Sequence, residues 1–292
     1  MPTLTHTSGG SADFYIPSEL SPATFARFAG FITGELGIKM PPSKLSLVQN
    51  RLQRRIRELQ LASLEEYADY FFAASNFAER EHFTNAITTN KTDFFREPEH
   101  FAYLCDVVIP TLTPQIIRCG ERFKAWSAGC SSGEEAYTLA MLFSEYSAHQ
   151  AGFDFAILGT DISTKVLDNA RNGVYPEAHT APVPAEFRRK YLLRSQNKSA
   201  ALARIIPALR KRVSFHQLNF MDDSYRISDF FHAVFFRNVM IYFDRDTQEA
   251  VINKICRNLV PGGYLFVGHS ESVAGLTIPL QRVKTSVYRK SE

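Results

Sequence analysis

From Phe123 to the end of the chain, short apolar segments alternate with helical ones, and few folds accommodate this rhythm. Phe153–Gly159 (FDFAILG) is apolar at nearly every position, which is typical of a strand covered on both faces by helices. Such alternation predicts an α/β domain with a doubly wound, Rossmann-like parallel sheet. The expected strands are Phe123–Ala128, Phe153–Gly159, Val213–His216, His232–Phe236, Tyr264–Gly268 and Arg282–Arg289. The expected helices are Glu134–Tyr146, Ser163–Asn172 and Asp246–Leu259.

The first part of the chain has a purely helical pattern. Ser21 and Pro22 are typical of a helix start, and apolar residues then recur at helical spacing as far as Gly37. A second apolar stripe and a third helix start at Ser63 follow. We therefore predict a small all-helical domain over residues 19–89, preceded by a loose tail over residues 1–18 and followed by the α/β domain over residues 90–292.

One segment, residues 173–212, interrupts the alternation. It spans about 40 residues rich in Pro, Arg and Lys, whereas plain connections are usually about 4–6 residues long. It is therefore an inserted subdomain or a partner-binding loop.

Composition and cysteine usage narrow the class of protein. The 292 residues are 45% hydrophobic and 22% charged, and the net charge of +3 is too small to indicate a nucleic-acid partner. The four cysteines form no CxxC pair and have no histidine at ligand spacing, so we expect neither a disulfide framework nor a metal site. With no signal peptide and no apolar run near ~18 residues, we expect a cytoplasmic protein that does not insert into membranes.

The turn Ala128–Glu134 lies where doubly wound sheets bind their ligands, beyond the end of a strand. Gly129 and Gly133 allow the backbone to approach a ligand closely. The turn has neither a GxGxxG pattern nor the lysine of a phosphate-binding loop. Glu134 and Glu135 open the following helix and would repel a pyrophosphate. The turn thus favours a cofactor with positive charge, such as S-adenosylmethionine.

Three other polar residues each have a functional and a structural interpretation. Asp161 follows a strand and either accepts hydrogen bonds from a ribose or caps the helix that begins near Ser163. Arg96 either binds a carboxylate of cofactor or substrate or forms a salt bridge with Glu97 or Glu99. Tyr242 is either a site residue or a core aromatic whose hydroxyl has a backbone partner.

Four segments carry a resemblance to a known family. NKTDFFRE, SAGCSSGEEAY, GTDIS and FRNVMIYFD occur in this order, and together they resemble the CheR-type chemotaxis receptor methyltransferases. The resemblance covers nearly the whole chain and makes the insertion a small β-subdomain. It implies methyl transfer from S-adenosylmethionine to glutamate side chains on the cytoplasmic methylation helices of chemoreceptors. The products are glutamate methyl esters and S-adenosylhomocysteine.

The resemblance also implies roles for individual residues, none of them metal ligands. Arg96 and Tyr242 match the two residues that flank the transferred methyl group. The cofactor contacts that it implies are Asn90, Thr92, Arg96, Glu134, Asp161, Asn219, Phe220, Arg237 and Asn238.

Partner binding is implied at one helix face. Arg51, Arg54 and Arg55 match a basic helix that docks acidic receptor helices, although such charges also occur on ordinary solvated surfaces. Family members that grip a receptor's C-terminal pentapeptide have a glycine-containing turn in the subdomain. Here residues 194–198 (RSQNK) contain no glycine, so tethering is not expected, while peptide addition to a strand edge stays open. We expect a monomer.

Two rival functions remain from the residues alone. The chain could methylate RNA or a small molecule, or it could be a cofactor-binding sensor without catalysis. A pure sensor has less need of both Arg96 and Tyr242, which favours the enzyme.

Overall fold

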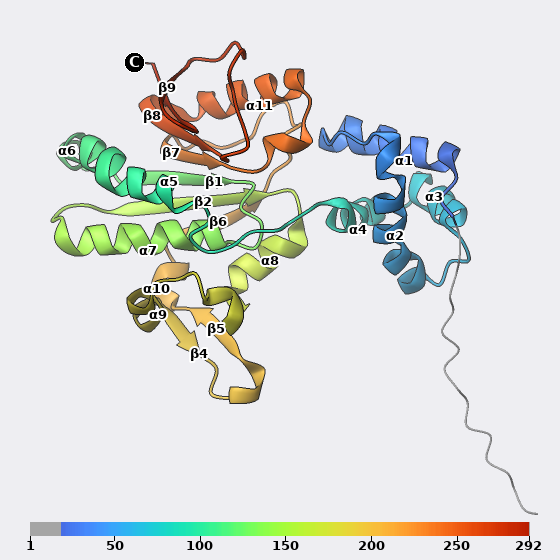
Figure 1. Cartoon of the computed structure of the whole chain (residues 1–292), viewed down its shortest axis with the longest axis horizontal. Helices are drawn as coiled ribbons and strands as arrows, with labels where there is room; N and C mark the ends of the chain where they lie inside the picture. Colours follow the sequence, from blue (N-terminus) through green and yellow to red (C-terminus); the bar gives the residue numbers. More distant parts are fainter. Residues whose placement is uncertain (1–18, 292) are drawn as a thin grey trace, which may run out of the picture.

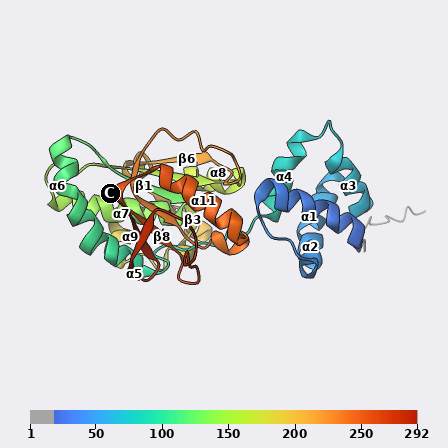
Figure 2. The same cartoon turned by 90° about the horizontal axis from the view of Figure 1, so that it is seen from above.

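The computed structural model describes residues 19–291, so the tail predicted for residues 1–18 lies outside the described residues. The chain forms two lobes joined side by side (Figures 1 and 2). The smaller lobe, blue in Figure 1, contains helices only, and the larger lobe is built around a sheet.

Local sequence signals define the smaller lobe. Its helices are α1 (Pro22–Leu36), α2 (Leu45–Leu59), α3 (Leu64–Phe72) and α4 (Phe77–Ile87), with a 3-10 turn, η1 (Pro42–Lys44), before α2. Helix α1 begins at the predicted cap, where the Ser21 hydroxyl accepts a hydrogen bond from the Thr24 N–H at 3.2 Å, and it ends at left-handed Gly37. The apolar stripes of these helices meet in a core around Phe28, Tyr67 and Phe83, whose side chains are all fully buried.

The larger lobe contains the predicted α/β alternation with one change. Its seven-stranded sheet has the order β6-β2-β1-β7-β8-β10-β9. The strands are β1 (Phe123–Ala128), β2 (Phe155–Asp161), β6 (Val213–Gln217), β7 (Phe231–Phe236), β8 (Leu259–Val267), β9 (Leu280–Lys284) and β10 (Val287–Lys290). The prediction of one last strand over Arg282–Arg289 was wrong, because left-handed Ser286 (φ 59°) turns this segment back into two antiparallel strands. The sheet is therefore mixed, with five parallel strands and an antiparallel edge.

Helices cover both faces of this sheet. One face packs against α5 (Pro98–Tyr103), a π-turn η2 (Leu104–Val108), α6 (Ile109–Cys119), α7 (Glu134–His149) and α8 (Thr164–Asn172). The other face packs against α11 (Arg245–Arg257). Neighbouring residues of β1 point to opposite cores, Ala125 to the first and Trp126 to the second. Burial on both faces explains why the strands are apolar throughout.

The insertion forms a small sheet of its own, coloured yellow in Figure 1. Strands β3 (Val174–Pro176), β5 (Leu202–Ile205) and β4 (Leu192–Arg194) are antiparallel in that order. Short helices accompany them: η3 (Glu177–Thr180), α9 (Ala185–Tyr191), η4 (Lys198–Ala200) and α10 (Pro207–Arg210). The Tyr175 hydroxyl donates to the Ser132 carbonyl at 2.7 Å, which joins the subdomain to the turn after β1.

Among residues 19–291, no helix has both the length and the apolar character needed to cross a bilayer.

We predict that His232 makes stability fall in mild acid. Burial lowers the pKa of His232, and its Nδ1 accepts the Lys124 N–H at 3.0 Å, so the native state holds the neutral ring. Because the folded pKa is lowered, this stabilisation is present above the unfolded pKa of about 6.5 and is lost as pH falls through the folded value. Urea unfolding at pH 7.5 and pH 5 measures the free energy of unfolding at each pH. The decrease between the two should be smaller in His232→Asn than in the unmodified protein, because asparagine keeps an acceptor but does not titrate.

The exposed His216 provides the matched control. His216→Asn should retain the pH dependence of the unmodified protein. An equal loss of stability in His232→Asn and the unmodified protein would contradict the assignment.

Candidate active site

A cavity lies at the carboxyl ends of β1, β2 and β7, where the two lobes meet. Strand β1 pairs with β2 on one side and β7 on the other, so chain connections leave it in opposite directions. This is the switch point at which open α/β sheets bind ligands. Side chains of both lobes line the cavity, among them Leu36 and Arg51 from the helical lobe and Asp161 and Arg237 from the sheet lobe.

Most of the predicted site residues meet in this cavity although they are far apart in sequence. Those that line it are Arg51, Asn90, Thr92, Arg96, Asp161, Asn219, Phe220, Arg237, Asn238 and Tyr242. Glu134, Arg54 and Arg55 do not line it, whereas Glu135 does.

The turn after β1 is held in an unusual backbone conformation. Gly129 has a φ of 81°, and a Cβ there would lie 2.5 Å from a methyl carbon of Val239, so only glycine fits. Asp161 then locks the turn, because its Oδ2 accepts the Ser131 N–H at 2.9 Å and its Oδ1 accepts the Ser163 N–H at 3.0 Å. The N-cap of α8 is Ser163 and not Asp161, so the structural interpretation of Asp161 as the helix cap was wrong. Asp161 instead fixes the backbone on both sides of this junction and lines the cavity.

Arg237 lies at the centre of a buried ion network. Its side chain is only 3% exposed, and its guanidinium lies 3.1 Å from Glu97 Oε2 and 3.1 Å from Glu135 Oε2. The same guanidinium donates to the Arg96 carbonyl. Burial acts to raise the pKa of Glu97, but Arg237 and the Asn238 amide outweigh it and hold that pKa below its usual value. One arginine thus joins the segment before α5, the start of α7 and the end of β7.

The loop after β7 has its own anchor in Glu271, which the sequence analysis missed. Asn238 is left-handed (φ 58°), and the Glu271 carboxylate accepts the N–H groups of Asn238 at 2.8 Å, Gly268 at 2.6 Å and Ile241 at 3.3 Å. Glu271 is 8% exposed. The only signal for it was a carboxylate shortly after the apolar strand β8, a pattern too common to single out.

Arg96 has its side chain available to a ligand. It donates Nη1 to the Lys91 carbonyl at 3.3 Å and, among residues 19–291, pairs with no carboxylate. The salt bridge with Glu97 or Glu99 considered above is therefore absent there, and Glu97 pairs with Arg237 instead.

The helical lobe closes the cavity through polar contacts. The Lys39 N–H donates to the Tyr242 carbonyl at 2.8 Å, and the Asn219 amide donates to the Glu35 carbonyl at 2.7 Å. Arg51 donates to the Ile87 carbonyl and to the Thr89 hydroxyl. Tyr242 and Asn219 therefore hold the lobes together as well as lining the cavity.

Comparison with known proteins now supplies the family. The model of the CheR methyltransferase SAM-binding domain matches residues 90–289, and that of the CheR methyltransferase all-alpha domain matches residues 23–88. The chain belongs to the CheR methyltransferase family. It is therefore an S-adenosylmethionine-dependent methyltransferase, as the four segments predicted.

Relatives match along almost the full length. A chemotaxis protein methyltransferase of Borreliella burgdorferi is 35% identical, covering 91% of this chain and 93% of that one. Chemotaxis protein methyltransferase 2 of Pseudomonas aeruginosa is 37% identical, covering 86% of this chain and 87% of that one. The chemotaxis protein methyltransferase of Salmonella typhimurium is 34% identical, covering 94% of this chain and 92% of that one. Among solved structures, a glycopeptide N-methyltransferase with S-adenosylmethionine has a TM-score of 0.35 at 15% identity over 70% of this chain and 61% of that one, too low to support a conclusion.

Glu135, next to the predicted Glu134, is the carboxylate that faces the cavity. Glu134 instead accepts the Ser132 hydroxyl, at 2.8 Å and 3.0 Å from its two oxygens. Glu135 accepts the Ser127 hydroxyl at 2.6 Å and shares Arg237 with Glu97. Burial raises the pKa of Glu135, and Arg237 offsets this only in part. A cationic ligand would stabilise its charged form, which fits the ammonium group of S-adenosylmethionine.

The predicted docking arginines have three different environments. The Arg55 guanidinium binds both oxygens of buried Glu79 at 2.7 Å, and the Tyr67 hydroxyl donates to Glu79 at 2.8 Å. Arg54 is 74% exposed beside Glu58, while Arg51 lines the cavity. Arg55 therefore stabilises the helical lobe, a role that helical spacing could not reveal.

We predict that Glu135→Gln weakens S-adenosylhomocysteine binding about tenfold or more, because a charged hydrogen bond contributes roughly 1.5–3 kcal/mol. Glu134→Gln is the matched control and should change affinity less than about twofold, as expected for a group outside the cavity. Isothermal titration calorimetry measures both. A larger loss of S-adenosylhomocysteine affinity in Glu134→Gln than in Glu135→Gln would contradict the placement of Glu135 at the ligand.

We predict that Arg55→Ala lowers the free energy of unfolding by about 3–5 kcal/mol, because it leaves the Glu79 carboxylate buried without its cation. Arg54→Ala should change it by less than about 0.5 kcal/mol. Urea unfolding distinguishes them, and equal effects would show that Arg55 is an ordinary surface residue.

Proposed function

We propose that this protein transfers the methyl group of S-adenosylmethionine to glutamate carboxylates on the cytoplasmic methylation helices of chemoreceptors. The products are glutamate 5-O-methyl esters and S-adenosylhomocysteine, and the reaction serves signalling adaptation in the cytoplasm. The observation that carries the proposal is that Arg96 and Tyr242, from distant segments, line one cavity together with Glu135 and Asp161.

Charge in the cavity supports the choice of cofactor. Of the residues that line the cavity, Glu135 would bind the ammonium group and Asp161 the ribose. Asn90, Thr92 and Arg96 would hold the methionine end and Asn219 and Phe220 the adenine, while Arg237 and Asn238 would complete the pocket. When bound, S-adenosylmethionine supplies an electrophilic methyl group on a sulfonium centre. The turn that Asp161 locks has no lysine and no free run of N–H groups for a pyrophosphate, which disfavours a nucleotide phosphate.

The residues have little proton chemistry to perform. A glutamate with a pKa of about 4.3 is already ionised at neutral pH, so the site needs no general base. Arg96, which pairs with no carboxylate in the described part of the chain, orients the substrate carboxylate. The Tyr242 phenol, half-buried at the cavity wall, donates a second positioning hydrogen bond. Apolar walls such as Leu36 and Phe243 keep water away from the reacting atoms.

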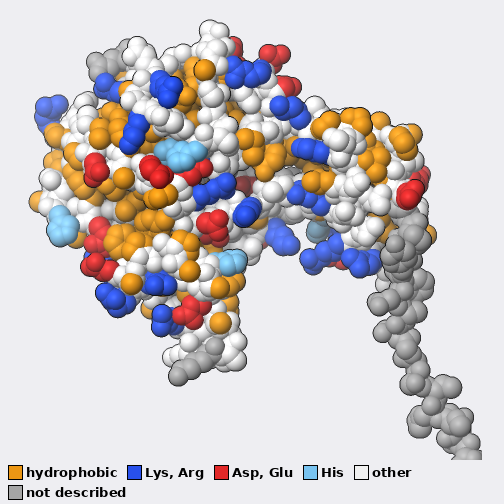
Figure 3. Space-filling view, viewed as in Figure 1, with side chains coloured by type: hydrophobic (Ala, Val, Ile, Leu, Met, Phe, Trp, Pro, Cys, Tyr) orange, Lys and Arg blue, Asp and Glu red, His pale blue; other side chains and the backbone are white. Residues whose placement is uncertain are grey.

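The notch between the lobes supports docking of an acidic helix. Figure 3 shows Lys and Arg side chains along this notch. Arg51 and Lys44 line the cavity from the helical lobe, Lys91 lies at its mouth, and Arg54 is exposed nearby. Methylation helices rich in glutamate have complementary charge. We place docking on residues 19–89 and catalysis on residues 90–292, with 173–212 as the β-subdomain, and propose neither a pentapeptide tether nor a nucleic-acid partner.

The proposal is tested by transfer of radiolabelled methyl from S-adenosylmethionine to receptor-containing membranes of the source organism. Label on the receptor that is released as methanol in alkali identifies a carboxyl methyl ester. Binding of S-adenosylhomocysteine without any transfer to these membranes would reject the receptor as substrate.

We predict that Arg96→Ala and Tyr242→Phe each reduce turnover by a larger factor than they reduce S-adenosylhomocysteine affinity, because both groups act on the substrate carboxylate. Turnover is measured by the methyl-transfer assay and affinity by calorimetry. Arg118→Ala and Tyr70→Phe, at exposed positions away from the cavity, are matched controls and should leave both quantities unchanged. Unchanged turnover in the first pair would rule out these roles.

A further inference from the structure

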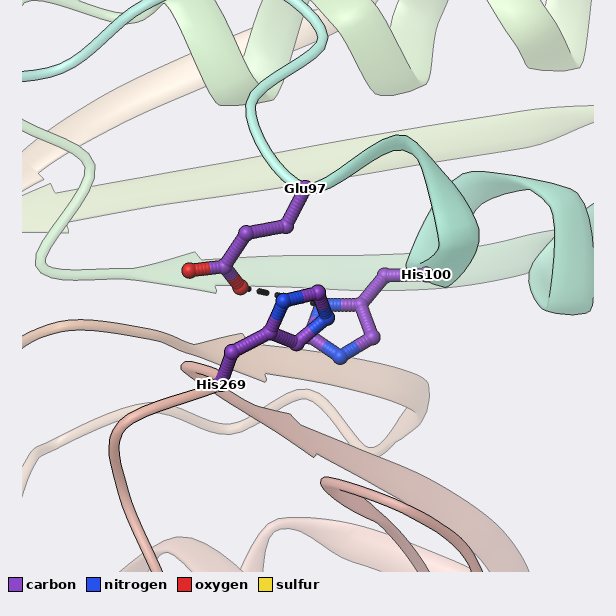
Figure 4. A group of neighbouring side chains, drawn as sticks. All are labelled: Glu97, His100 and His269. Carbon is purple, nitrogen blue, oxygen red and sulfur yellow. Dashed lines mark ion pairs between the residues drawn. The ribbon is translucent and has the colours of Figure 1, made fainter.

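Behind the cavity, three side chains able to bind metal converge from two segments. Glu97 and His100 lie at the start of α5, and His269 follows β8; one ligand atom from each lies within 4.8 Å of the others. Figure 4 shows both imidazole rings next to the Glu97 carboxylate. The two ring centroids are 4.7 Å apart.

His100 is the unusual member of this cluster. It is 2% exposed, and neither of its ring nitrogens has a hydrogen-bond partner among the described residues. A buried polar group without a partner is costly, and native proteins rarely leave one so. The fold thus keeps a buried metal-ligating group that makes no hydrogen bond among the described residues, although the Glu97 carboxylate lies 3.4 Å from its Nδ1.

His100 and Glu97 are already as far apart as two ligands of one zinc ion. Ligands about 2.1 Å from a tetrahedral zinc ion are about 3.4 Å from each other. His100 Nδ1 and Glu97 Oε2 are 3.4 Å apart. His269 is 46% exposed, so its ring can rotate toward this pair and an ion can enter from solvent. The Glu99 carboxylate, 3.9 Å from His269 Nε2, is available as a fourth group.

We propose that Glu97, His100 and His269 form a site for a divalent transition-metal ion of the zinc class, beside the methyl-transfer cavity. Two imidazoles and one carboxylate are a donor set that zinc accepts. The site uses none of the four cysteines and goes beyond the proposed methyl transfer, so it differs from the expectation of no metal in the sequence analysis.

An ion at this site acts on the cavity through Glu97. The same Oε2 atom lies 3.1 Å from Arg237 Nη2, and Glu97 Oε1 accepts the Asn238 amide at 3.3 Å. A metal ion competes with Arg237 for this carboxylate, while Glu135 still pairs with Arg237. Because Arg237 and Asn238 line the cavity, metal binding and cofactor binding oppose each other, and by linkage the effect is reciprocal.

The test titrates Co²⁺ and Zn²⁺ into the full chain after chelator treatment, with Co²⁺ followed by visible absorption and Zn²⁺ by calorimetry. We expect one ion per chain at this site, with a Co²⁺ spectrum that lacks thiolate bands. His269→Ala, an exposed change that leaves the core intact, should weaken binding at least tenfold. Zn²⁺ should weaken S-adenosylhomocysteine binding in the unmodified protein but not in His269→Ala.

Two matched controls separate this site from other donors. His149→Ala and Cys119→Ser change exposed side chains of types that can bind metal but that lie elsewhere. Both variants should leave ion binding unchanged. Absence of binding, equal binding in His269→Ala, or loss of binding in either control would overturn the proposal. None of these outcomes depends on methyl transfer, so they test the metal site separately from the proposed function.

Discussion

The ion network of Arg237 holds the cavity in shape. One buried guanidinium lies between Glu97 and Glu135 and also donates to the backbone of Arg96. Each partner belongs to a different segment, so the segment before α5, the start of α7 and the end of β7 keep their positions through this side chain. Removing the arginine would leave two carboxylates buried without their cation, a change far costlier than losing a surface pair.

This network also supports backbone conformations that would otherwise be unfavourable. Among residues 19–291, eight non-glycine residues have positive φ, and four of them belong to segments around the cavity: Phe95, Glu97, Ser131 and Asn238. Such conformations cost on the order of 1–3 kcal/mol each and persist only where surrounding contacts enforce them. Asp161 accepts the Ser131 N–H, and Glu271 and Glu97 accept the N–H and the side-chain amide of Asn238, which enforces two of these conformations. The site is therefore held in place before a ligand arrives, which favours precise positioning over proton chemistry.

Much of the fold follows from local patterns. Apolar runs predicted the five parallel strands because burial on both faces requires them, and Ser21, Gly37 and Ser63 marked helix ends through their capping chemistry. Residues 98–119 were not assigned, since Pro110 and Pro114 obscure the helical pattern. Pro110 lies in the first turn of α6, directly after the π-turn, whereas Pro114 lies inside the helix. The sequence analysis chose Glu134 and not Glu135 as the cofactor contact, whereas Glu135 lines the cavity. Neighbouring helix positions differ by about 100°, and only packing decides which one faces the cavity.

The ion pairs of the site and of the helical lobe could not be predicted from the sequence. The Arg55–Glu79 and Arg237–Glu97 pairs join residues distant in sequence, and a single sequence offers no signal for such partners.

That the cavity around Arg237 holds the cofactor is tested most directly by a crystal structure with S-adenosylhomocysteine bound. The ligand should lie in this cavity, with its amino group at Glu135 and its ribose beside Asp161. Density for the ligand elsewhere, or an amino group directed to Glu134, would contradict it.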